Sequence, residues 1–444
     1  MSRIDEPSGA SGLGTHLAAM CRQQAELVAL GWDGERWDYR RLAERAAHIA
    51  AQLMERGLGP GDRVGLYLER SAELLATMLG CIRAGMCFVP LAPDLPLPRL
   101  QALIRRLDVQ LIVMSVPTRG VFPVPVHGLR PGGRDDLPWP ELHHRLPVCI
   151  LPGAGGGRGD VTLTRRALAS YLHRVTERME ACAGSRWLAV TALTEVEGLL
   201  EWLGPLWVGG YVEIVSSDLR DKPVELAALL RRRPDLNTLQ GSPGFWRRLL
   251  KAGWRGHRGL VALCSGTGPD LALATHLQDC VGQLWNCYGT TATVGWSMMR
   301  RVSFPLAERS LHLGQSLDGY RHWVLDAEGG DVAVGGVGEL CIECDEPALV
   351  RDAGAPVQWC GRQVRRTGIR VRKQGWDGFH YLGPLEKPNR LCGFRIELGD
   401  LESGLRQLAA RMNQQGAGAG ACLVGYVEVA AEGGARGLAP RGRQ

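Results

Sequence analysis

Residues 37–96 read WDYRRLAERAAHIAAQLMERGLGPGDRVGLYLERSAELLATMLGCIRAGMCFVPLAPDLP. Apolar side chains recur with helical spacing in the first part of this stretch, which predicts a helix over 38–57. A Gly-Pro-Gly turn then leads into the strand-like segment VGLYL, which starts at Val64. A second helix is expected over 72–84, and a second strand over 87–91. Because helix and strand alternate, the stretch predicts an α/β fold with much parallel sheet.

The same alternation continues to about residue 300. From about 305 to 384 the apolar segments become short and strand-rich, which indicates a separate β-rich unit. A last β–α–β pattern occupies 393–430, and the tail AAEGGARGLAPRGRQ has the composition of a disordered segment. Two stretches, PALVRDAGAPVQW and GPLEKPNR, are expected to be loops.

Composition and charge exclude several classes of protein. The 444 residues are 45% apolar, and no apolar run is long enough to cross a bilayer. The first residues, MSRIDEPSGASG, lack the apolar segment of an export signal, so we expect a cytoplasmic protein without a membrane partner. The net charge of +6 is mild, and the basic residues are spread along the chain with short runs such as Arg231–Arg233 that contain no aromatic residues, so we expect no nucleic-acid partner.

The cysteines favour a reducing compartment. Thirteen of them are scattered along the chain, which is typical of reduced cytosolic thiols. One Cys-x-x-Cys pair, Cys341 and Cys344, lies in the strand-like segment GELCIEC. Because no second pair or nearby histidine completes a zinc site, we interpret both as ordinary strand residues and expect no metal site.

A glycine-rich loop lies in the stretch ILPGAGGGRGDVTLTRRAL, residues 150–168. An apolar strand, a glycine loop and a helix-like segment follow one another, which is the layout that binds phosphate through backbone N–H groups and a helix N-terminus. The residues from Gly153 to Gly159 include no serine, threonine or lysine, and the first 221 residues of the chain contain no lysine. We therefore expect a loop that retains the turn and lacks the side chains of a phosphate site.

Several stretches carry a resemblance to a known family. The block at 37–96 is followed in order by VELAALLRRRPDLNTLQGSPGFWRRLLKAGW, LWNCYGTTATVGWS, GVGELCIE, RRTGIRVR and GFRIELGDLE. Over roughly residues 15–430 the chain resembles the adenylation domains of nonribosomal peptide synthetases. These domains belong to the adenylate-forming superfamily, which includes acyl-CoA synthetases and luciferases.

The resemblance implies a fold and a reaction. The α/β core at 1–384 would comprise two stacked α/β subdomains and a β-rich, barrel-like subdomain. The residues 385–444 would form a truncated, small α+β subdomain with a disordered tail. The family converts ATP and a carboxylic acid into an acyl-adenylate and pyrophosphate, and then passes the acyl group to a carrier thiol. That reaction needs groups that hold the triphosphate, Mg²⁺, the ribose and the carboxylate.

The family's phosphate loop usually reads Tyr-Thr-Ser-Gly-Ser/Thr-Thr-Gly-x-Pro-Lys-Gly. With Gly153 and Gly156 on its internal glycines, the lysine position falls on Gly159. The hydroxyl positions fall on Leu151, Pro152, Ala154 and Gly155. Arg158 lies one residue from the lysine position and could partly substitute for it; the alternative is a surface loop without a ligand.

The adenine loop of the family, usually Asn-x-Tyr-Gly-Pro-Thr-Glu, keeps Asn286, Tyr288, Gly289 and Thr291. Tyr288 could stack on a purine or serve the core. The family's glutamate, a Mg²⁺ ligand, maps to Ala292, whose methyl group cannot coordinate a cation that requires oxygen ligands.

The ribose-binding aspartate of the family maps to Ile369 in RRTGIRVR, which offers the sugar hydroxyls no acceptor. A nearby family arginine maps to Pro384, and the hinge aspartate maps to Glu386. The family's bridging lysine has no counterpart, because no lysine follows Lys387.

In members that activate amino acids, an aspartate pairs with the substrate amino group. The anchor EWLGPL, which starts at Glu201, places Val196 at that position. Glu195 and Glu197 flank it, so a one-residue shift would restore an acid; otherwise the pocket suits an aryl or other non-amino acid, or no substrate.

These losses lead to three hypotheses. The first is a catalytically silent adenylation-like protein, without catalytic residues or cofactor, that contacts a carrier protein or another enzyme of a peptide-antibiotic or siderophore pathway. The second is an adenylate-forming ligase that uses ATP and Mg²⁺ with a rewired site. The third is a sensor that binds a small acid or nucleotide without turnover.

Overall fold

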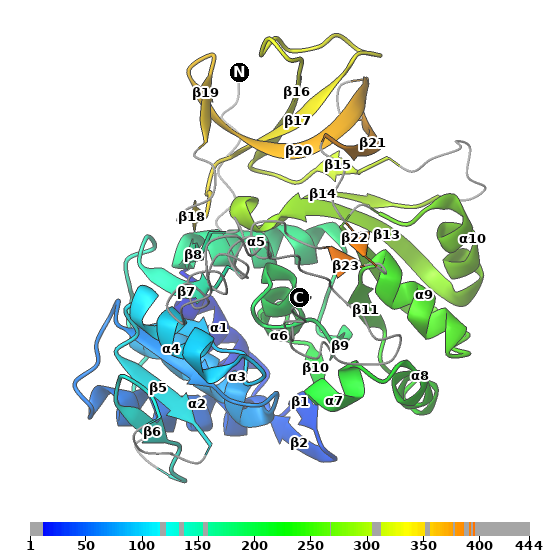
Figure 1. The fold of residues 1–444 in the computed structure, drawn as a ribbon. Helices are drawn as coiled ribbons and strands as arrows, with labels where there is room; N and C mark the ends of the chain where they lie inside the picture. The colour runs from blue at the N-terminus through cyan, green and yellow to red at the C-terminus, as the bar shows by residue number, and fades with distance from the viewer. Residues whose placement is uncertain are drawn as a thin grey trace, which may run out of the picture.

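The computed structural model describes residues 12–115, 121–132, 137–153, 159–266, 268–303, 312–350, 356–375, 378–385, 390–391 and 394–395. Two α/β units lie side by side, and a smaller β-rich unit covers one end of them (Figure 1). This arrangement confirms the expected adenylate-forming α/β architecture. The expected C-terminal subdomain at 385–444 lies almost wholly outside the described residues.

The first unit is a seven-stranded sheet in the order β18-β8-β7-β4-β3-β5-β6. Its central strands are parallel, whereas β7 and β8 form an antiparallel pair. Helix α4 covers its outer face, where Leu100 and Ile104 pack on β4 and β5. The elements are β3 (Arg63–Tyr67), β4 (Cys87–Pro90), α4 (Leu97–Arg106), β5 (Leu111–Met114), β6 (Val126–Gly128), β7 (Pro147–Leu151), β8 (Val161–Thr164) and β18 (Leu349–Val350).

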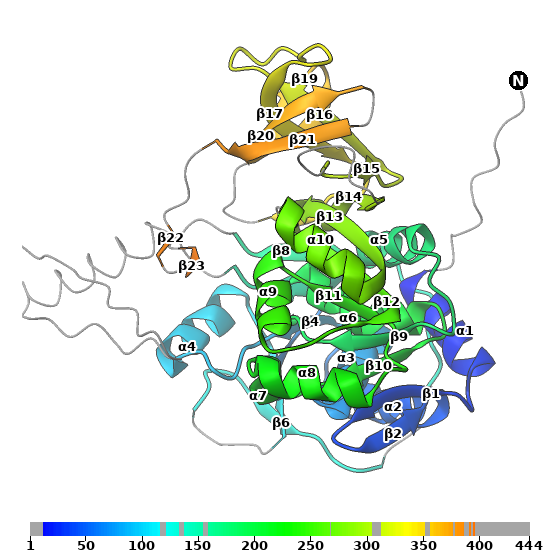
Figure 2. The same cartoon turned by 90° about the vertical axis from the view of Figure 1, so that its right-hand side faces the viewer.

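The second unit is a nine-stranded sheet in the order β15-β14-β13-β12-β11-β9-β10-β1-β2. The strands from β13 to β1 in this order are parallel, and antiparallel strands form both edges. Helices α8, α9 and α10 cover its outer face (Figure 2). The elements are β1 (Val28–Trp32), β2 (Glu35–Asp38), β9 (Arg186–Ala189), β10 (Tyr211–Ile214), α7 (Ser217–Arg220), α8 (Pro223–Arg232), β11 (Thr238–Gly241), α9 (Pro243–Lys251), β12 (His257–Ser265), α10 (Leu271–Cys280), β13 (Val281–Thr290), η1 (Thr291–Thr293), β14 (Gly295–Arg301) and β15 (Gln315–Ser316).

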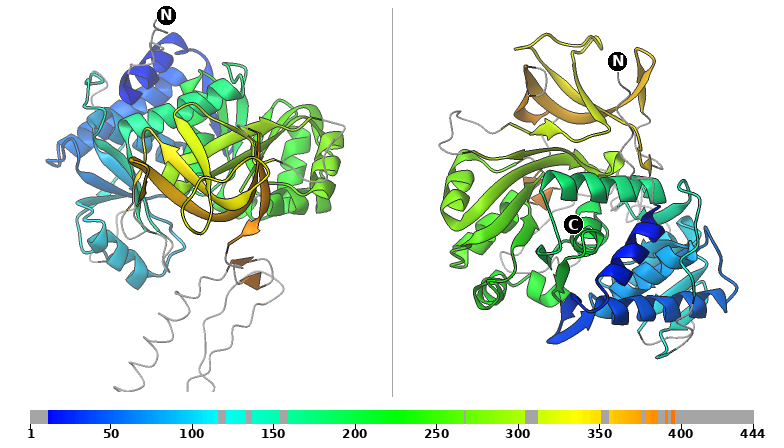
Figure 3. Two further views of the ribbon diagram at one scale, coloured as in Figure 1. Left: turned by 90° about the horizontal axis from the view of Figure 1, so that it is seen from above. Right: turned by 180° about the vertical axis from the view of Figure 1, so that it is seen from behind.

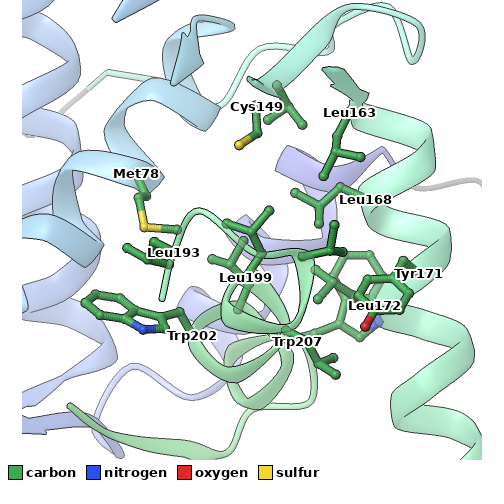
Figure 4. Close-up of a cluster of buried hydrophobic side chains, with 14 of the residues drawn as sticks. Met78, Cys149, Leu163, Leu168, Tyr171, Leu172, Leu193, Leu199, Trp202 and Trp207 are labelled. Atoms are coloured by element: carbon green, nitrogen blue, oxygen red, sulfur yellow. The ribbon is translucent and has the colours of Figure 1, made fainter. Parts of the chain in front are cut away.

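A layer of helices fills the space between the two sheets and forms the main core (Figures 1 and 4). Its buried side chains include the aromatic residues Trp202 and Tyr171 of the helices, together with Met78 of α3, Cys149 of β7 and Leu163 of β8. Burial of so much apolar surface is the dominant stabilising contribution in a fold of this size. The helices are α1 (Leu13–Gln23), α2 (Tyr39–Met54), α3 (Ala72–Ala84), α5 (Arg165–Arg178) and α6 (Val196–Trp207).

The helices begin where short polar side chains precede apolar repeats. Asp38 caps α2 by accepting the backbone N–H of Arg41 at 2.7 Å, and Ser71 caps α3 through Leu74. Gly85 ends α3 in the left-handed conformation, with a φ of 78°. The predicted helices at 38–57 and 72–84 and the strands from Val64 and over 87–91 are therefore confirmed within a few residues.

The third unit is a five-stranded antiparallel sheet with the order β16-β17-β20-β19, and β21 pairs with β20 (Figure 3). Cys341 and Cys344 lie three positions apart on β17, so their side chains leave opposite faces of the strand. They pack in separate clusters, which confirms their interpretation as ordinary strand residues. The strands are β16 (Tyr320–Leu325), β17 (Val337–Cys344), β19 (Val357–Trp359), β20 (Arg362–Gln374) and β21 (Gly378–Pro384); β22 (Arg390–Leu391) and β23 (Phe394–Arg395) form a separate pair.

Two local predictions are wrong. The glycine-rich loop does not lead directly into a helix, because β8 stands between them and pairs with β7. The two stretches predicted as loops contain the short strands β18 and β19 and the ends of β21 and β22. Strands of two or three residues leave too few positions for a periodic pattern.

None of the helices in the described residues has the length and apolar character that a membrane span needs.

Candidate functional site

The candidate site lies where parallel strands of the nine-stranded sheet end, which is where open α/β sheets bind ligands. Strand β13 ends there in the adenine-loop segment, and η1 follows it. Tyr320 of β16 donates to the carbonyl oxygen of Thr293 at 2.8 Å, and Thr367 of β20 lies within hydrogen-bonding reach of Tyr288. The β-rich unit therefore contacts the adenine-loop segment directly.

The described ends of the glycine-rich loop are joined by a carboxylate. Asp160 is 5% exposed, and its Oδ1 accepts the backbone N–H of Gly153 at 3.0 Å. The same oxygen accepts a hydrogen bond from Nη2 of Arg106 at 2.7 Å. Gly156 and Arg158 lie outside the described residues. A backbone N–H that could meet a phosphate is thus bonded to an acid of the chain itself, and this was not foreseen from the sequence.

The adenine-loop segment holds four of the predicted residues together. Asn286 is 2% exposed and donates through Nδ2 to the carbonyl oxygen of His312 at 2.6 Å. Its Oδ1 is buried and finds no hydrogen-bond donor among the described residues. An orphaned buried acceptor costs free energy unless a ligand or water satisfies it. This oxygen is therefore suited to the amino group of a nucleobase.

Tyr288, Gly289 and Thr291 differ in exposure. Tyr288 is buried, and burial raises the pKa of its hydroxyl well above its usual value. A Cβ at Gly289 would lie 1.9 Å from the carbonyl oxygen of Gly295, so only glycine fits between β13 and β14. Thr291 is exposed. Tyr288 is thus a core residue first, and its ring is not freely available for stacking.

The positions of the metal and the ribose carry no oxygen. Ala292 is half-buried in η1, and the described residues contain no group of three or more His, Cys, Asp or Glu side chains that could hold a metal ion. Ile369 is half-buried in β20, where its backbone is paired with Pro384 of β21. Its side chain packs against the main core. Glu386 lies outside the described residues.

The turn before Ile369 is held by a carboxylate on the neighbouring strand. Glu339 is 5% exposed and accepts the backbone N–H of Gly368 at 2.9 Å, as well as Nε of Arg366. Gly368 adopts a φ of 70°. The backbone of the ribose segment is therefore well fixed, while its functional side chain is aliphatic.

The three candidate pocket residues at the start of α6 differ in their burial. Val196 is fully buried, whereas Glu195 is exposed at the N-cap. Glu197 is half-buried, and its charge acts on Tyr171 and Cys287, where burial and this carboxylate raise the pKa of each group well above its ordinary value. Glu197 is therefore an acid close enough to Cys287 of β13 to influence it electrostatically.

A buried polar network that the sequence did not reveal lies below these strand ends. Glu201 of α6 is fully buried and accepts the backbone N–H groups of Val190 and Thr191 at 2.6 and 2.7 Å. Thr191 also contacts Gln240 at 2.7 Å, and Gln240 donates to Ser265 at 2.8 Å. Burial raises the pKa of Glu201 to about 7. Glu201 lies among the apolar residues Leu199, Leu200 and Trp202 of α6, and an acid in such a run was the sequence signal for this network.

Arg70 is the cationic member of this network. It is 7% exposed and donates to the carbonyl oxygens of Ala189, Thr191 and Val215 at 2.6 to 2.7 Å. Burial lowers its pKa to about 10. Arg70 follows β3 of the first sheet, whereas its acceptors lie at the ends of β9 and β10, so it ties the two sheets together.

The chain matches the model of a known protein family. Residues 17–135 and 160–348, which are more than half of the chain, match the family model described as AMP-binding enzyme. The chain belongs to the AMP-binding enzyme family. The interval between the two matched segments, 136–159, contains the glycine-rich loop. Residues 1–16 and 349–444 are also unmatched, so the unmatched parts of the chain include the ribose position at Ile369 as well as the glycine-rich loop.

This AMP-binding enzyme homologue resembles nonribosomal peptide synthetases in particular. It is 28% identical over 415 residues to a dimodular nonribosomal peptide synthase of Bacillus subtilis (strain 168), covering 86% of this chain and 17% of that protein. It is 27% identical over 413 residues to the syringomycin synthase SyrB1 of Pseudomonas syringae pv. syringae, covering 87% of this chain and 67% of that protein. The chain therefore spans about a sixth of the first of these relatives.

Solved structures of nonribosomal peptide synthetases superpose on this fold. The four-domain nonribosomal peptide synthetase holo-AB3403, bound to AMP and glycine, superposes with a TM-score of 0.77 at 28% identity, covering 90% of this chain and 31% of that chain. An artificially fused adenylation–PCP di-domain, NpsA-ThdA from Klebsiella oxytoca, superposes with a TM-score of 0.74 at 20% identity, covering 89% and 76% of the chains. The latter likeness supports the fold alone.

The residues present fit one part of ATP and not the rest. The orphaned Oδ1 of Asn286 suits the base. Ile369 offers the ribose no acceptor, Ala292 offers Mg²⁺ no ligand, and Asp160 places a carboxylate on the backbone N–H of Gly153. MgATP therefore does not fit this site as the family motifs would hold it.

Proposed function

We propose that this chain is an adenylation-domain homologue of a nonribosomal peptide pathway that does not form acyl-adenylates. It works through contacts with a carrier protein or a neighbouring pathway enzyme. The observation that carries this proposal is Ile369, a half-buried aliphatic side chain that packs against the core at the position of the ribose-binding aspartate. Ala292 and the bonded pair of Asp160 and Gly153 support it at the metal and phosphate positions.

Several groups that the family reaction requires are missing at the same time. Removing one charge-assisted donor from a transition state typically costs about 3–4 kcal/mol. Such losses are not additive, but here they affect the phosphate, metal and ribose positions together. The surrounding fold is intact, with the strands, helix caps and core of an adenylation domain. A scaffold retained without its ligand groups favours a role in protein contacts.

ATP–pyrophosphate exchange tests this function. With a broad panel of amino and aryl acids, the wild-type chain is expected to show no exchange above the enzyme-free background. Robust exchange that Arg158→Ala abolishes would refute the proposal. The contact role is tested separately by titrating purified carrier proteins of peptide synthetases, in apo and holo form, into the chain; saturable binding is expected.

The alternative is an adenylate-forming ligase with a rewired site that activates an amino or aryl acid. Two observations favour it: the orphaned Oδ1 of Asn286, and the placement of Glu197 near β13. Glu197 would then pair with a substrate amino group. Under this alternative Glu197→Gln abolishes exchange with amino acids, whereas Glu195→Gln, at an exposed position, leaves it unchanged.

A further inference from the structure

A polar hollow of about 390 Å³ lies at the start of β13, at the opposite end of this strand from the adenine-loop segment. Arg258 of β12, Gln278 of α10, Gln283 of β13 and Arg301 of β14 line it, and Ser303 follows β14 at its rim. Gln283 and Gly289 are six residues apart, which corresponds to about 20 Å along a strand. The hollow is therefore separate from the candidate nucleotide site.

The charge of the hollow is positive. Two of its lining side chains are guanidinium groups, and among the described residues that line it none is acidic. Nη1 of Arg258 donates a hydrogen bond to the carbonyl oxygen of Gln278 at 3.2 Å. Arg301 is exposed and has no partner among the described residues. Guanidinium groups match the oxygens of phosphate in geometry and charge.

Gln283 supplies a neutral donor whose orientation is fixed. Its Oε1 accepts the indole N–H of Trp285 at 3.2 Å. This assigns the oxygen of the amide to Trp285 and leaves its NH₂ group without an acceptor among the described residues. Donors from Arg258, Gln283, Arg301 and Ser303 thus surround one space, which is the complement of a tetrahedral oxyanion.

We propose that this hollow binds a phosphate monoester of a small molecule. Two arginines balance a dianion, and a volume of about 390 Å³ exceeds that of the phosphate group, leaving room for an organic substituent. Nothing in this inference depends on the function proposed above, because it uses no residue of the nucleotide site.

Calorimetric titration with inorganic phosphate at mildly alkaline pH tests the proposal. The wild-type chain is expected to bind one phosphate saturably, and more weakly as ionic strength rises. Gln283→Glu keeps an acceptor for Trp285 and replaces the donor with a carboxylate oxygen. This variant and Arg301→Gln are each expected to weaken binding by about ten-fold or more.

Arg300→Gln is the matched control. Arg300 precedes Arg301 on β14, is exposed, and does not line the hollow. Its substitution should change phosphate affinity by less than about two-fold, as expected for a surface charge. The proposal is overturned if the wild-type chain binds no phosphate saturably, if Gln283→Glu and Arg301→Gln bind it as the wild type does, or if Arg300→Gln weakens binding equally.

Discussion

The Oδ1 atom of Asp160 lies 3.0 Å from the backbone nitrogen of Gly153 and accepts its N–H. This bond closes the base of the glycine-rich loop with a carboxylate that Arg106 neutralises from α4. In a working phosphate loop, such backbone N–H groups are free to meet an anionic ligand. The chain thus supplies its own anion at this position.

The first prediction concerns this internal anion. Asp160→Asn removes the charge that pairs with Arg106 and leaves a buried amide, so we expect the free energy of unfolding to fall by about 1–3 kcal/mol. Chemical denaturation measures it. Arg106→Gln and the double variant complete a cycle, in which the losses should be clearly less than additive. Full additivity would mean that the two side chains do not stabilise the fold as a pair.

The second prediction concerns pH. The pKa of Glu201 is raised from 4.5 to about 7, so the folded chain binds this proton more tightly than the unfolded chain. Its contribution to stability is therefore present at low pH and is lost as pH rises through about 7. Between about pH 5 and pH 8, the unfolding free energy of wild type minus that of Glu201→Gln should fall by about 3 kcal/mol.

Denaturation series at several pH values measure this difference. Glu44→Gln, which removes a carboxyl group at an exposed position of α2, is the matched control. A pH-independent difference for Glu201→Gln would contradict the burial of an ionisable carboxyl group at this position.

The third prediction concerns the tie between the sheets. Arg70→Met removes the donor from three backbone carbonyl groups and a cation from the vicinity of Glu201. We expect a loss of about 3–5 kcal/mol in unfolding free energy. Arg247→Met, which breaks an exposed ion pair with Asp270, should cost less than about 1 kcal/mol. If the two variants lose the same unfolding free energy, Arg70 does not stabilise the fold more than an exposed arginine does.

The fourth prediction concerns restoration of the nucleotide site. The triple variant Gly159→Lys, Ala292→Glu and Ile369→Asp returns a cation, a metal ligand and a ribose acceptor to the family positions. MgATP should raise the melting temperature of this variant and leave the parent unchanged, since a ligand stabilises only a fold that binds it. Both proteins should carry Arg301→Gln, so that phosphate at the distal hollow does not contribute. If MgATP stabilises the parent as strongly, the residues at these three positions are not what prevents MgATP binding.

The sequence predicted the regular parts of the fold well. Helices α2 and α3 have long apolar repeats and clear caps at Asp38 and Ser71, and they lie where expected. Strand β8 was missed because its four residues, Val161–Thr164, are too few for a periodic signal to separate them from the helix that follows.

The resemblance assigned Asn286, Ile369 and Val196 to site positions, because collinear segments fix the alignment, and these assignments stay predictions. The contacts around them could not be predicted. The bond between Asp160 and Gly153 and the chain from Glu201 to Ser265 depend on side chains far apart in space until the chain folds. Local pattern carries no information about such pairings.

The central claim is that this site does not hold MgATP, and calorimetric titration of MgATP into the Arg301→Gln chain tests it most directly. The account predicts no saturable heat up to millimolar nucleotide. Saturable binding of one MgATP, lost when Asn286 is changed to alanine, would contradict it.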